Sequence, residues 1–306
     1  MIELQTISKG GNIMSDFTAE PLNRNTWRIK TPGCDCYLLE GTDEAILIDS
    51  GMSAQNIRAY AQSLTALPIR RVINTHSHFD HTAGNGFFEV VYGTPGIAKS
   101  AKNTMGCNPA DYPLDYTFTL VKDGDTIDLS GRPLEIIVLN CHAPGNLAVL
   151  DRKERMLFPG DELETGQVLL LPGYAERMGQ IHAESAATVE TYLHAMEKLS
   201  GFAEDFDTIC PAHNGSPIGR EWLYKYITLA KKILGGMEGK TDCSSPSYND
   251  RANHFPNPDA GYRRAEYDGA SLVYCADLIF DNDYKKSPGL NPATKLHLIC
   301  KDFARQ

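Results

Sequence analysis

The stretch Thr75–Gly84, THSHFDHTAG, crowds four side chains that can bind metal ions into six positions: His76, His78, Asp80 and His81. Burying imidazole and carboxylate groups costs free energy unless another group pairs with them, so an apolar core has little use for this cluster. A solvated surface loop is the alternative interpretation, but three of the nine histidines in the chain fall within this one span.

The residues on either side indicate where this cluster lies. Arg71–Asn74 is a short apolar run typical of a strand, and Ala83–Gly84 begins a turn or a helix. We therefore expect the four groups on a loop just beyond the C-terminal end of a strand, which is a usual position for functional sites in α/β folds.

The composition excludes several classes of protein. With 306 residues, 42% of them hydrophobic, the chain can bury one large core or two small ones. The 29 basic and 39 acidic residues leave a formal charge of −10, which disfavours a nucleic acid partner. Eight scattered cysteines without a C-x-x-C pair are typical of reduced thiols in a cytoplasmic protein. No run approaches the roughly 18 apolar residues of a membrane span, so we expect no membrane partner.

Short β-rich runs and amphipathic helices alternate along the chain, which predicts a mixed α and β fold. We expect a main domain over residues 14–235 and a small β-rich C-terminal extension, residues 236–306, that packs on it. Residues 1–13 show no periodicity and are expected to form a loose arm, with Met14 as an alternative start. Two hairpins are predicted, one through Asp123–Gly124 and one through Asp268–Gly269, between strands within 116–129 and 262–275.

Three later stretches each end a short apolar run with a histidine or an aspartate: His142, Asp161 and His213. One such residue after a strand is usually a cap or turn residue, but three in series weaken that interpretation. Asp49, after the apolar run Ala45–Ile48, adds a further strand end. Five histidines and two aspartates exceed what one tetrahedral ion needs and suit two ions about 3.5–4 Å apart.

Together these motifs, from Asp49 to His213, resemble the metallo-β-lactamase superfamily, and within it the hydrolases of the glyoxalase II type. The resemblance implies a four-layer αββα sandwich with the metals at one edge, whereas periodicity alone predicts only a mixed fold. It also implies a role for each ligand. His76, His78 and His142 would bind the first ion, Asp80, His81 and His213 the second, Asp161 would bridge both, and Asp49 would orient ligands near the first ion.

Particular positions separate the subfamilies. The flavodiiron oxygen reductases carry a glutamate where this chain has His78, and true β-lactamases carry cysteine or serine where it has Asp161. The nucleases of the superfamily usually add a basic exosite or a large inserted domain, which the charge of −10 does not favour. The resemblance therefore favours a small-molecule substrate: a thioester, a lactone, or another carbonyl ester or amide.

The implied reaction uses two divalent metal ions. Zinc suits the mixed nitrogen and oxygen ligands best, and iron and manganese are alternatives. A hydroxide held between the ions would attack the substrate carbonyl, and Asp80 and Asp161 would orient it. Cys141 and Cys210 adjoin ligands, but we expect them to pack in the core instead of acting as nucleophiles.

In the stretch 162–180, Tyr174 and Arg177 are candidate oxyanion or substrate contacts, with ordinary surface residues as the alternative. Tyr174 is thereby a candidate catalytic residue beside Asp80 and Asp161. A phosphodiesterase of the same fold and a non-catalytic metal-binding sensor remain as other functions. The sequence does not specify an oligomeric state.

Overall fold

Alternating apolar side chains give this chain two large sheets that bury both of their faces. In the strand Ala45–Ile48 (β4), Ile46 and Ile48 face the layer between the sheets, whereas Ala45 and Leu47 face outward. The strand Leu147–Asp151 (β10) alternates in the same way in the second sheet. The computed structural model describes residues 15–102, 107–108, 110–170, 187–241, 262–281 and 283.

The first sheet has seven strands in chain order, antiparallel from β1 to β4 and parallel from β4 to β7. They are Thr18–Asn23 (β1), Thr26–Lys30 (β2), Asp35–Glu40 (β3), β4, Ile69–Ile73 (β5), Val90–Gly93 (β6) and Phe118–Leu120 (β7).

The second sheet has the order β14-β13-β11-β10-β9-β8, with only β11 and β13 parallel. Its strands are Thr126–Asp128 (β8), Pro133–Val138 (β9), β10, Met156–Gly160 (β11), Thr208–Pro211 (β13) and Ile218–Gly219 (β14).

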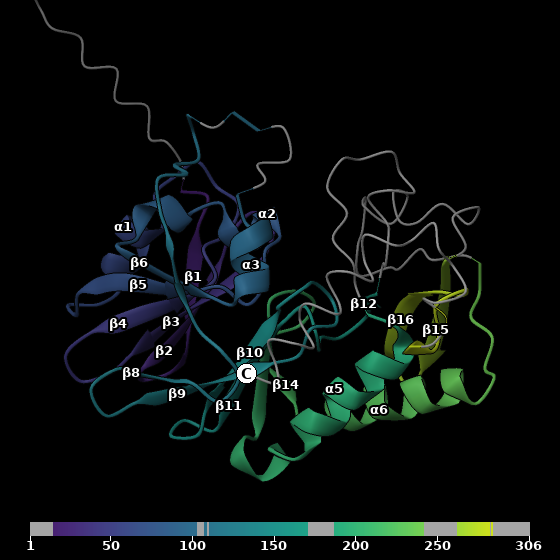
Figure 1. Ribbon diagram of the computed structural model, residues 1–306. Helices are drawn as coiled ribbons and strands as arrows, with labels where there is room; N and C mark the ends of the chain where they lie inside the picture. The colour runs from purple at the N-terminus through teal and green to yellow at the C-terminus, as the bar shows by residue number, and fades with distance from the viewer. Residues whose placement is uncertain are drawn as a thin grey trace, which may run out of the picture.

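Helices cover the outer faces of both sheets (Figure 1). The described helices are Ile57–Gln62 (α1), Phe79–Thr82 (α2), Pro95–Ser100 (α3), Val189–Ser200 (α5) and Glu221–Leu234 (α6), with 3-10 turns at Asn85–Phe87 and Ala203–Asp205. Of these, α3 packs its Ile97 into the cluster between the sheets instead. Helix α1 packs on the first sheet, whereas α5 and α6 pack on the second. The mixed α and β fold with four layers is therefore confirmed. Within the described residues, no helix is both long enough and apolar enough to cross a membrane.

The hairpin expected through Asp123–Gly124 is wrong, because its two strands belong to different sheets. Strand β7 pairs with β6 in the first sheet, and β8 pairs with β9 in the second. The turn itself forms, since Asp125 N donates to Lys122 O, but Gly124 N then donates to Ile136 O of β9. A local turn signal does not determine which neighbour a strand joins. Here Ile127 of β8 is buried in the cluster between the sheets and Phe118 of β7 packs against the same cluster, each from its own sheet.

The second predicted hairpin is confirmed. Tyr262–Tyr267 (β15) and Ala270–Cys275 (β16) pair antiparallel around Asp268–Gly269. Strand β16 also pairs with Val168–Leu169 (β12), and the order β12-β16-β15 makes a third, small sheet beside α5 and α6 (Figure 1).

A buried arginine joins the two large sheets at the end away from Asp49. Arg132 is 1% exposed, and its guanidinium donates to the Asp151 carboxylate and the Thr26 hydroxyl, each at 2.7 Å. It also donates to the carbonyl oxygens of Asn25 and Glu40. Glu40 pairs with Ala45 at the start of β4, whereas Asp49 follows the other end of that strand.

We expect Arg132→Ala to lower the free energy of unfolding by about 3–5 kcal/mol, because Asp151 would remain buried and charged without its partner. Urea unfolding of both proteins measures this difference. Arg152→Ala is the matched control: Arg152 pairs with Glu135 and Asp205, but its side chain is 45% exposed, so a loss of only about 0–1 kcal/mol is expected. Equal losses in the two variants would contradict the role of Arg132.

Candidate metal centre

The candidate ligands follow strands of both sheets at one edge of the sandwich. In the first sheet, Asp49 follows β4, and the stretch from His76 to His81 follows β5. In the second sheet, His142, Asp161 and His213 follow β9, β11 and β13. The structure brings the seven candidate ligands into two adjacent groups of donor atoms: His76, His78, His142 and Asp161, and Asp80, His81 and His213.

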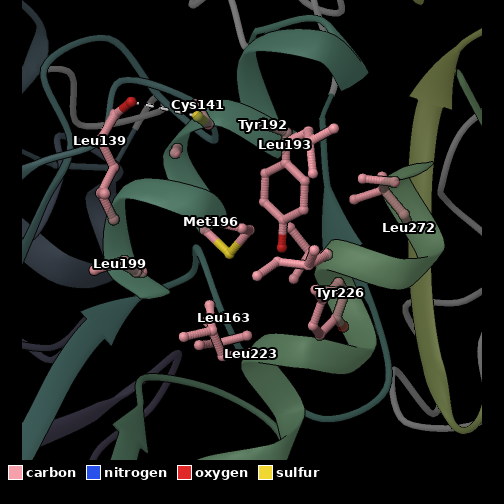
Figure 2. Close-up of a cluster of buried hydrophobic side chains, with 14 of the residues drawn as sticks. Leu139, Cys141, Leu163, Tyr192, Leu193, Met196, Leu199, Leu223, Tyr226 and Leu272 are labelled. Atoms are coloured by element: carbon pink, nitrogen blue, oxygen red, sulfur yellow. Dashed lines mark hydrogen bonds between the residues drawn. The ribbon is translucent and has the colours of Figure 1, made fainter. Parts of the chain in front are cut away.

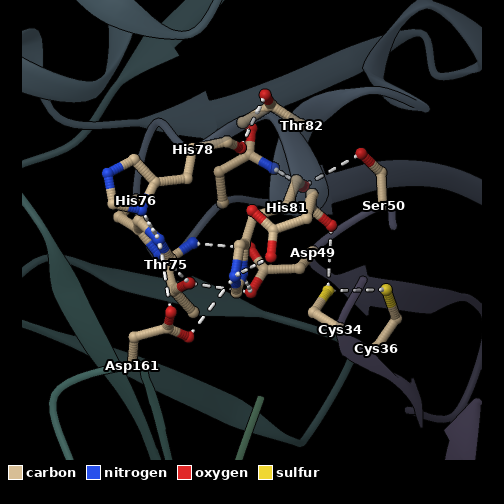
Figure 3. A network of polar contacts seen from close by, with 12 residues as sticks. Cys34, Cys36, Asp49, Ser50, Thr75, His76, His78, His81, Thr82 and Asp161 are labelled. Atoms are coloured by element: carbon tan, nitrogen blue, oxygen red, sulfur yellow. Dashed lines mark hydrogen bonds and ion pairs between the residues drawn. The ribbon is translucent and has the colours of Figure 1, made fainter. Parts of the chain in front are cut away.

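The loop expected around these residues is only partly present. His76 and His78 precede α2, whereas Asp80 and His81 lie within it, so a single helical turn presents both side chains to the site. Neighbouring segments hold this turn in place: Cys34 Sγ donates to Asp80 O, and Ser50 Oγ donates to His81 O, each at 3.0 Å (Figure 3).

Three ring nitrogens and one carboxylate oxygen converge in the first group. His78 Nδ1 lies 2.9 Å from His76 Nε2 and 3.1 Å from His142 Nε2. Asp161 Oδ2 lies 3.8 Å from the same nitrogen of His76 and 3.6 Å from that of His142. Four such donor atoms around one point are the ligand set of a tetrahedral metal ion.

The second group uses the same aspartate. His81 Nε2 lies 3.3 Å from Asp161 Oδ1, and His213 Nε2 lies 3.3 Å from Asp161 Oδ2. Asp80 Oδ2 lies 3.6 Å from the His81 nitrogen and 3.4 Å from the His213 nitrogen. Asp161 therefore faces both groups, with one oxygen toward His81 and the other toward His213 and the first group.

Two buried polar atoms show that these residues fit metal ions. Among the described residues, neither His81 Nε2 nor Asp161 Oδ1 has a hydrogen-bond partner, although both atoms are buried. A buried polar atom without a partner costs about 1–3 kcal/mol, and more for a charged group. A cation between these two atoms would remove that cost for both.

The electrostatics of the cluster also favour cations. Burial opposes ionisation of Asp161, but the positive charges of His213 and His81 outweigh it and hold the pKa of this carboxyl well below its usual range. The pKa of Asp80 is lowered for the same reasons, with His81 contributing most. Burial and the neighbouring imidazoles lower the pKa of His76, and burial with His78 lowers that of His142 to about 4. Although burial opposes it, the carboxylates raise the pKa of His81 and that of His213. The first group therefore has the neutral imidazoles and the ionised carboxylate that metal binding requires, whereas an ion at the second group would displace protons from His81 and His213.

Asp49 orients the ligands, but not in the way expected. Its Oδ2 accepts from His81 Nδ1 at 2.8 Å, so it acts directly on the second group (Figure 3). It reaches the first group only through Thr75, whose hydroxyl donates to Asp49 and lies 3.1 Å from His76 Nδ1. Asp49 has a φ of 61°, in the left-handed region that non-glycine residues seldom adopt and that is often found at functional sites.

Two supports of His142 were not expected from the sequence. The carbonyl oxygen of Leu169 accepts from His142 Nδ1 at 2.8 Å. The buried Glu162 carboxylate accepts from the backbone nitrogens of His142 and Cys141, at 2.6 and 3.1 Å. The position of Glu162 beside Asp161 was a usable signal, whereas a backbone carbonyl such as that of Leu169 has no signature in the sequence.

The remaining candidates divide into two sets. Cys141 and Cys210 pack in the hydrophobic cores, as expected, and Figure 2 shows Cys141 beside Leu139. Tyr174 and Arg177 lie outside the described residues, so their role as substrate contacts stays a prediction.

Comparison with known proteins agrees with this geometry. The model of the metallo-beta-lactamase superfamily matches residues 30–213. Acyl-coenzyme A thioesterase MBLAC2 of Gallus gallus is 24% identical over 252 residues, 72% of this chain and 86% of that protein. Hydroxyacylglutathione hydrolase of Francisella tularensis subsp. novicida is 28% identical over 180 residues, 58% of this chain and 62% of that protein. The solved metallo-beta-lactamase from Pontibacter korlensis superposes with a TM-score of 0.54 at 17% identity, covering 70% of this chain and 99% of that one.

This chain belongs to the metallo-beta-lactamase superfamily, because the family match spans both halves of the sandwich and every strand end that carries a candidate ligand. It is a metal-dependent hydrolase of that superfamily.

We expect Asp49→Asn to weaken binding of the ion at the second group by about 10–100-fold, the usual cost of losing a partner of a metal ligand. Asp49 accepts from three donors: His81 Nδ1, Thr75 N and the Thr75 hydroxyl. An amide offers only one oxygen to them and turns its NH₂ toward another donor. Competitive chelator titration measures the affinity. The exposed Asp43→Asn is the control, and equal affinities for the two variants would contradict the role of Asp49.

Proposed function

We propose that this chain hydrolyses a small-molecule thioester, or a related carbonyl ester or lactone, with two divalent metal ions. The position of Asp161 carries the proposal: one carboxylate lies within 3.3–3.8 Å of ring nitrogens in both donor groups. Two of the relatives support the substrate class, since one is an acyl-coenzyme A thioesterase and the other a hydrolase of hydroxyacylglutathione.

The metal assignment follows from the donor atoms. The first ion would be held by His76, His78 and His142, the second by Asp80, His81 and His213, with Asp161 between them. Histidine nitrogens with carboxylate oxygens suit zinc best, and iron or manganese can occupy such a set. When bound, such ions supply a water molecule of lowered pKa and polarise a carbonyl group.

The residues of the chain would orient the reactants. Asp80 and Asp161 stay ionised, so each can accept a hydrogen bond from the attacking water molecule. Such a hydrogen bond would orient the water so that a lone pair of the water oxygen points at the carbonyl carbon. The side chain of Asp80 is 23% exposed, against 11% for Asp161, which places Asp80 nearer to an entering substrate. His81 is held by Asp49 and His142 by Leu169, so neither ring is free to rotate as the substrate binds.

The described thiols next to ligands do not supply a nucleophile. Burial raises the pKa of Cys210 to about 12, and it raises that of Cys141 well above the ordinary value. A thiol reacts as its thiolate, so both side chains are inert at neutral pH. Attack by water therefore accounts for the hydrolysis better than a covalent intermediate on either cysteine.

We expect the purified protein to hold about two transition-metal ions per chain and to lose its hydrolase activity on chelation. Metal analysis gives the stoichiometry. A substrate panel of acyl-coenzyme A and acyl-glutathione thioesters, a lactone, a β-lactam and bis-p-nitrophenyl phosphate gives the reaction class. If the protein hydrolyses the phosphodiester but no thioester or lactone, the proposed reaction becomes phosphodiester hydrolysis in place of carbonyl hydrolysis. An absence of stoichiometric metal would overturn the proposal.

In the same assay, Asp161→Ala should lower kcat/KM on the best substrate by more than roughly 100-fold. Losing a residue that only supports a metal ligand costs up to about 100-fold in activity, and Asp161 is itself a candidate ligand of both ions. Asp43→Ala, an exposed aspartate on the β3–β4 turn, is the control and should keep the wild-type rate. Full activity of Asp161→Ala would show that this carboxylate does not hold the ions together.

A further inference from the structure

The C-terminal hairpin lies outside the residues 30–213 that the family match covers, yet it is joined to the metal centre. Its inner strand β16 pairs in parallel with the two-residue strand β12, with Leu272 opposite Val168 and Val273 opposite Leu169. Leu170 N, directly after β12, donates to Val273 O at 2.7 Å. Strand β12 is the edge of this sheet, so β16 is its one sheet neighbour among the described strands.

Strand β12 in turn holds a metal ligand. The carbonyl oxygen of Leu169 accepts from His142 Nδ1 at 2.8 Å. This bond places the ring proton on Nδ1 and leaves the lone pair of Nε2 pointing into the first donor group, 3.1 Å from His78 Nδ1. The position of Leu169 O therefore sets both the tautomer and the direction of the His142 ring.

The chain that follows the hairpin is linked to the backbone beside His142 through the start of α5. The Asp281 carboxylate accepts from the hydroxyls of Thr188 and Thr191 at the start of α5, at 2.6 and 2.5 Å. Just before that helix, Ala187 N donates at 2.8 Å to the carbonyl oxygen of Cys141, the residue before His142. One C-terminal segment thus supports the ring of His142 through β12 and its backbone through α5.

Apolar packing fixes the hairpin firmly enough to act as such a support. Leu272 is fully buried and belongs to the same cluster as Tyr192, Leu193 and Tyr226 of α5 and α6 (Figure 2). The outer strand β15 is held as well, because Arg264 and Lys240 exchange two backbone hydrogen bonds just beyond α6. A shift of β16 would therefore move β12 against a packed core.

We propose that the C-terminal hairpin β15–β16 and Asp281 are positioning elements that hold His142 in the orientation required to bind the first metal ion. The proposal rests on the proposed function, in that it takes the His76, His78 and His142 group to be a metal site. It differs from a general contribution to stability, because it concerns the first ion and not the second. Among the described residues, the second ion's ligands Asp80, His81 and His213 make no hydrogen bond or ion pair with β12.

The first test compares two leucines buried to the same extent. Leu272→Ala alters the face of β16, and Leu39→Ala removes the same side chain from β3, at the end of the sandwich away from the metals. Zinc affinity is measured by chelator competition in two backgrounds. His213→Ala removes a ligand of the second ion, so it reports the affinity for the first ion, and His76→Ala removes a ligand of the first ion, so it reports the affinity for the second. We expect Leu272→Ala to weaken the first ion about 10–100-fold and the second less than threefold, and Leu39→Ala to change neither beyond threefold.

A second readout needs no metal. In protein labelled with ¹⁵N-histidine, the ring resonances of His142 should report the Nδ1–H tautomer in the wild type and in Leu39→Ala, and a mixture of tautomers in Leu272→Ala. Equal weakening of both ions by Leu272→Ala, or an unchanged His142 tautomer together with unchanged affinity for the first ion, would overturn the proposal.

A milder pair of variants decides the matter if Leu272→Ala does not fold. Asp281→Ala removes the acceptor for Thr188 and Thr191, whereas Glu197→Ala removes a partly exposed acid that pairs with Lys231 near the other end of α5. We expect only Asp281→Ala to weaken the first ion, about threefold or more, and identical affinities for the two variants would overturn the proposal. If the wild type binds no zinc, the proposed function fails, and the His142 tautomer still reports whether the hairpin positions the ring.

Discussion

The carboxylate of Asp161 lies within 3.8 Å of ring nitrogens from four histidines, and its side chain is only 11% exposed. Such a cluster is costly to bury in the absence of cations, because its carboxylates remain ionised and two of its polar atoms have no hydrogen-bond partner among the described residues. Its ligands come from both large sheets, so the two donor groups exist only once the sandwich has formed. We therefore expect metal binding and folding to be coupled in this chain.

The two ends of the sandwich perform different tasks. At one end Arg132 satisfies Asp151 and three other acceptors, so the sheets are joined by a polar group whose partners are all protein atoms. At the other end the polar groups converge on one another in two groups that could each hold a metal ion. Backbone and side-chain acceptors behind the ligands, from Asp49 and Leu169, then fix the ring orientations. A preorganised site needs both features: sheets joined at the Arg132 end of the sandwich, and ligand rings held in orientation at the metal end.

The C-terminal hairpin β15–β16, which lies beyond the family match, is bonded to the rest of the structure. Strand β16 takes β12 into a third sheet, and residues after the hairpin bond to the start of α5. Both connections end beside His142, which is the one ligand of the first group that the second sheet supplies besides Asp161. Through them the C-terminal segment contributes to the geometry of a site whose ligands all precede it in the sequence.

The sequence by itself determined the class of fold, the seven metal-binding candidates and the burial of Cys141 and Cys210, because ligand spacing and apolar alternation are local patterns. Only the tertiary structure decided that β7 and β8 part into different sheets, since turn residues such as Asp123–Gly124 specify a bend and not a strand's neighbour. It also decided that Asp49 bonds to His81 of the second group, and that Leu169 O holds His142. These contacts join residues 27 or more positions apart, and one of them uses a backbone atom that every residue possesses, so no local pattern could have revealed them.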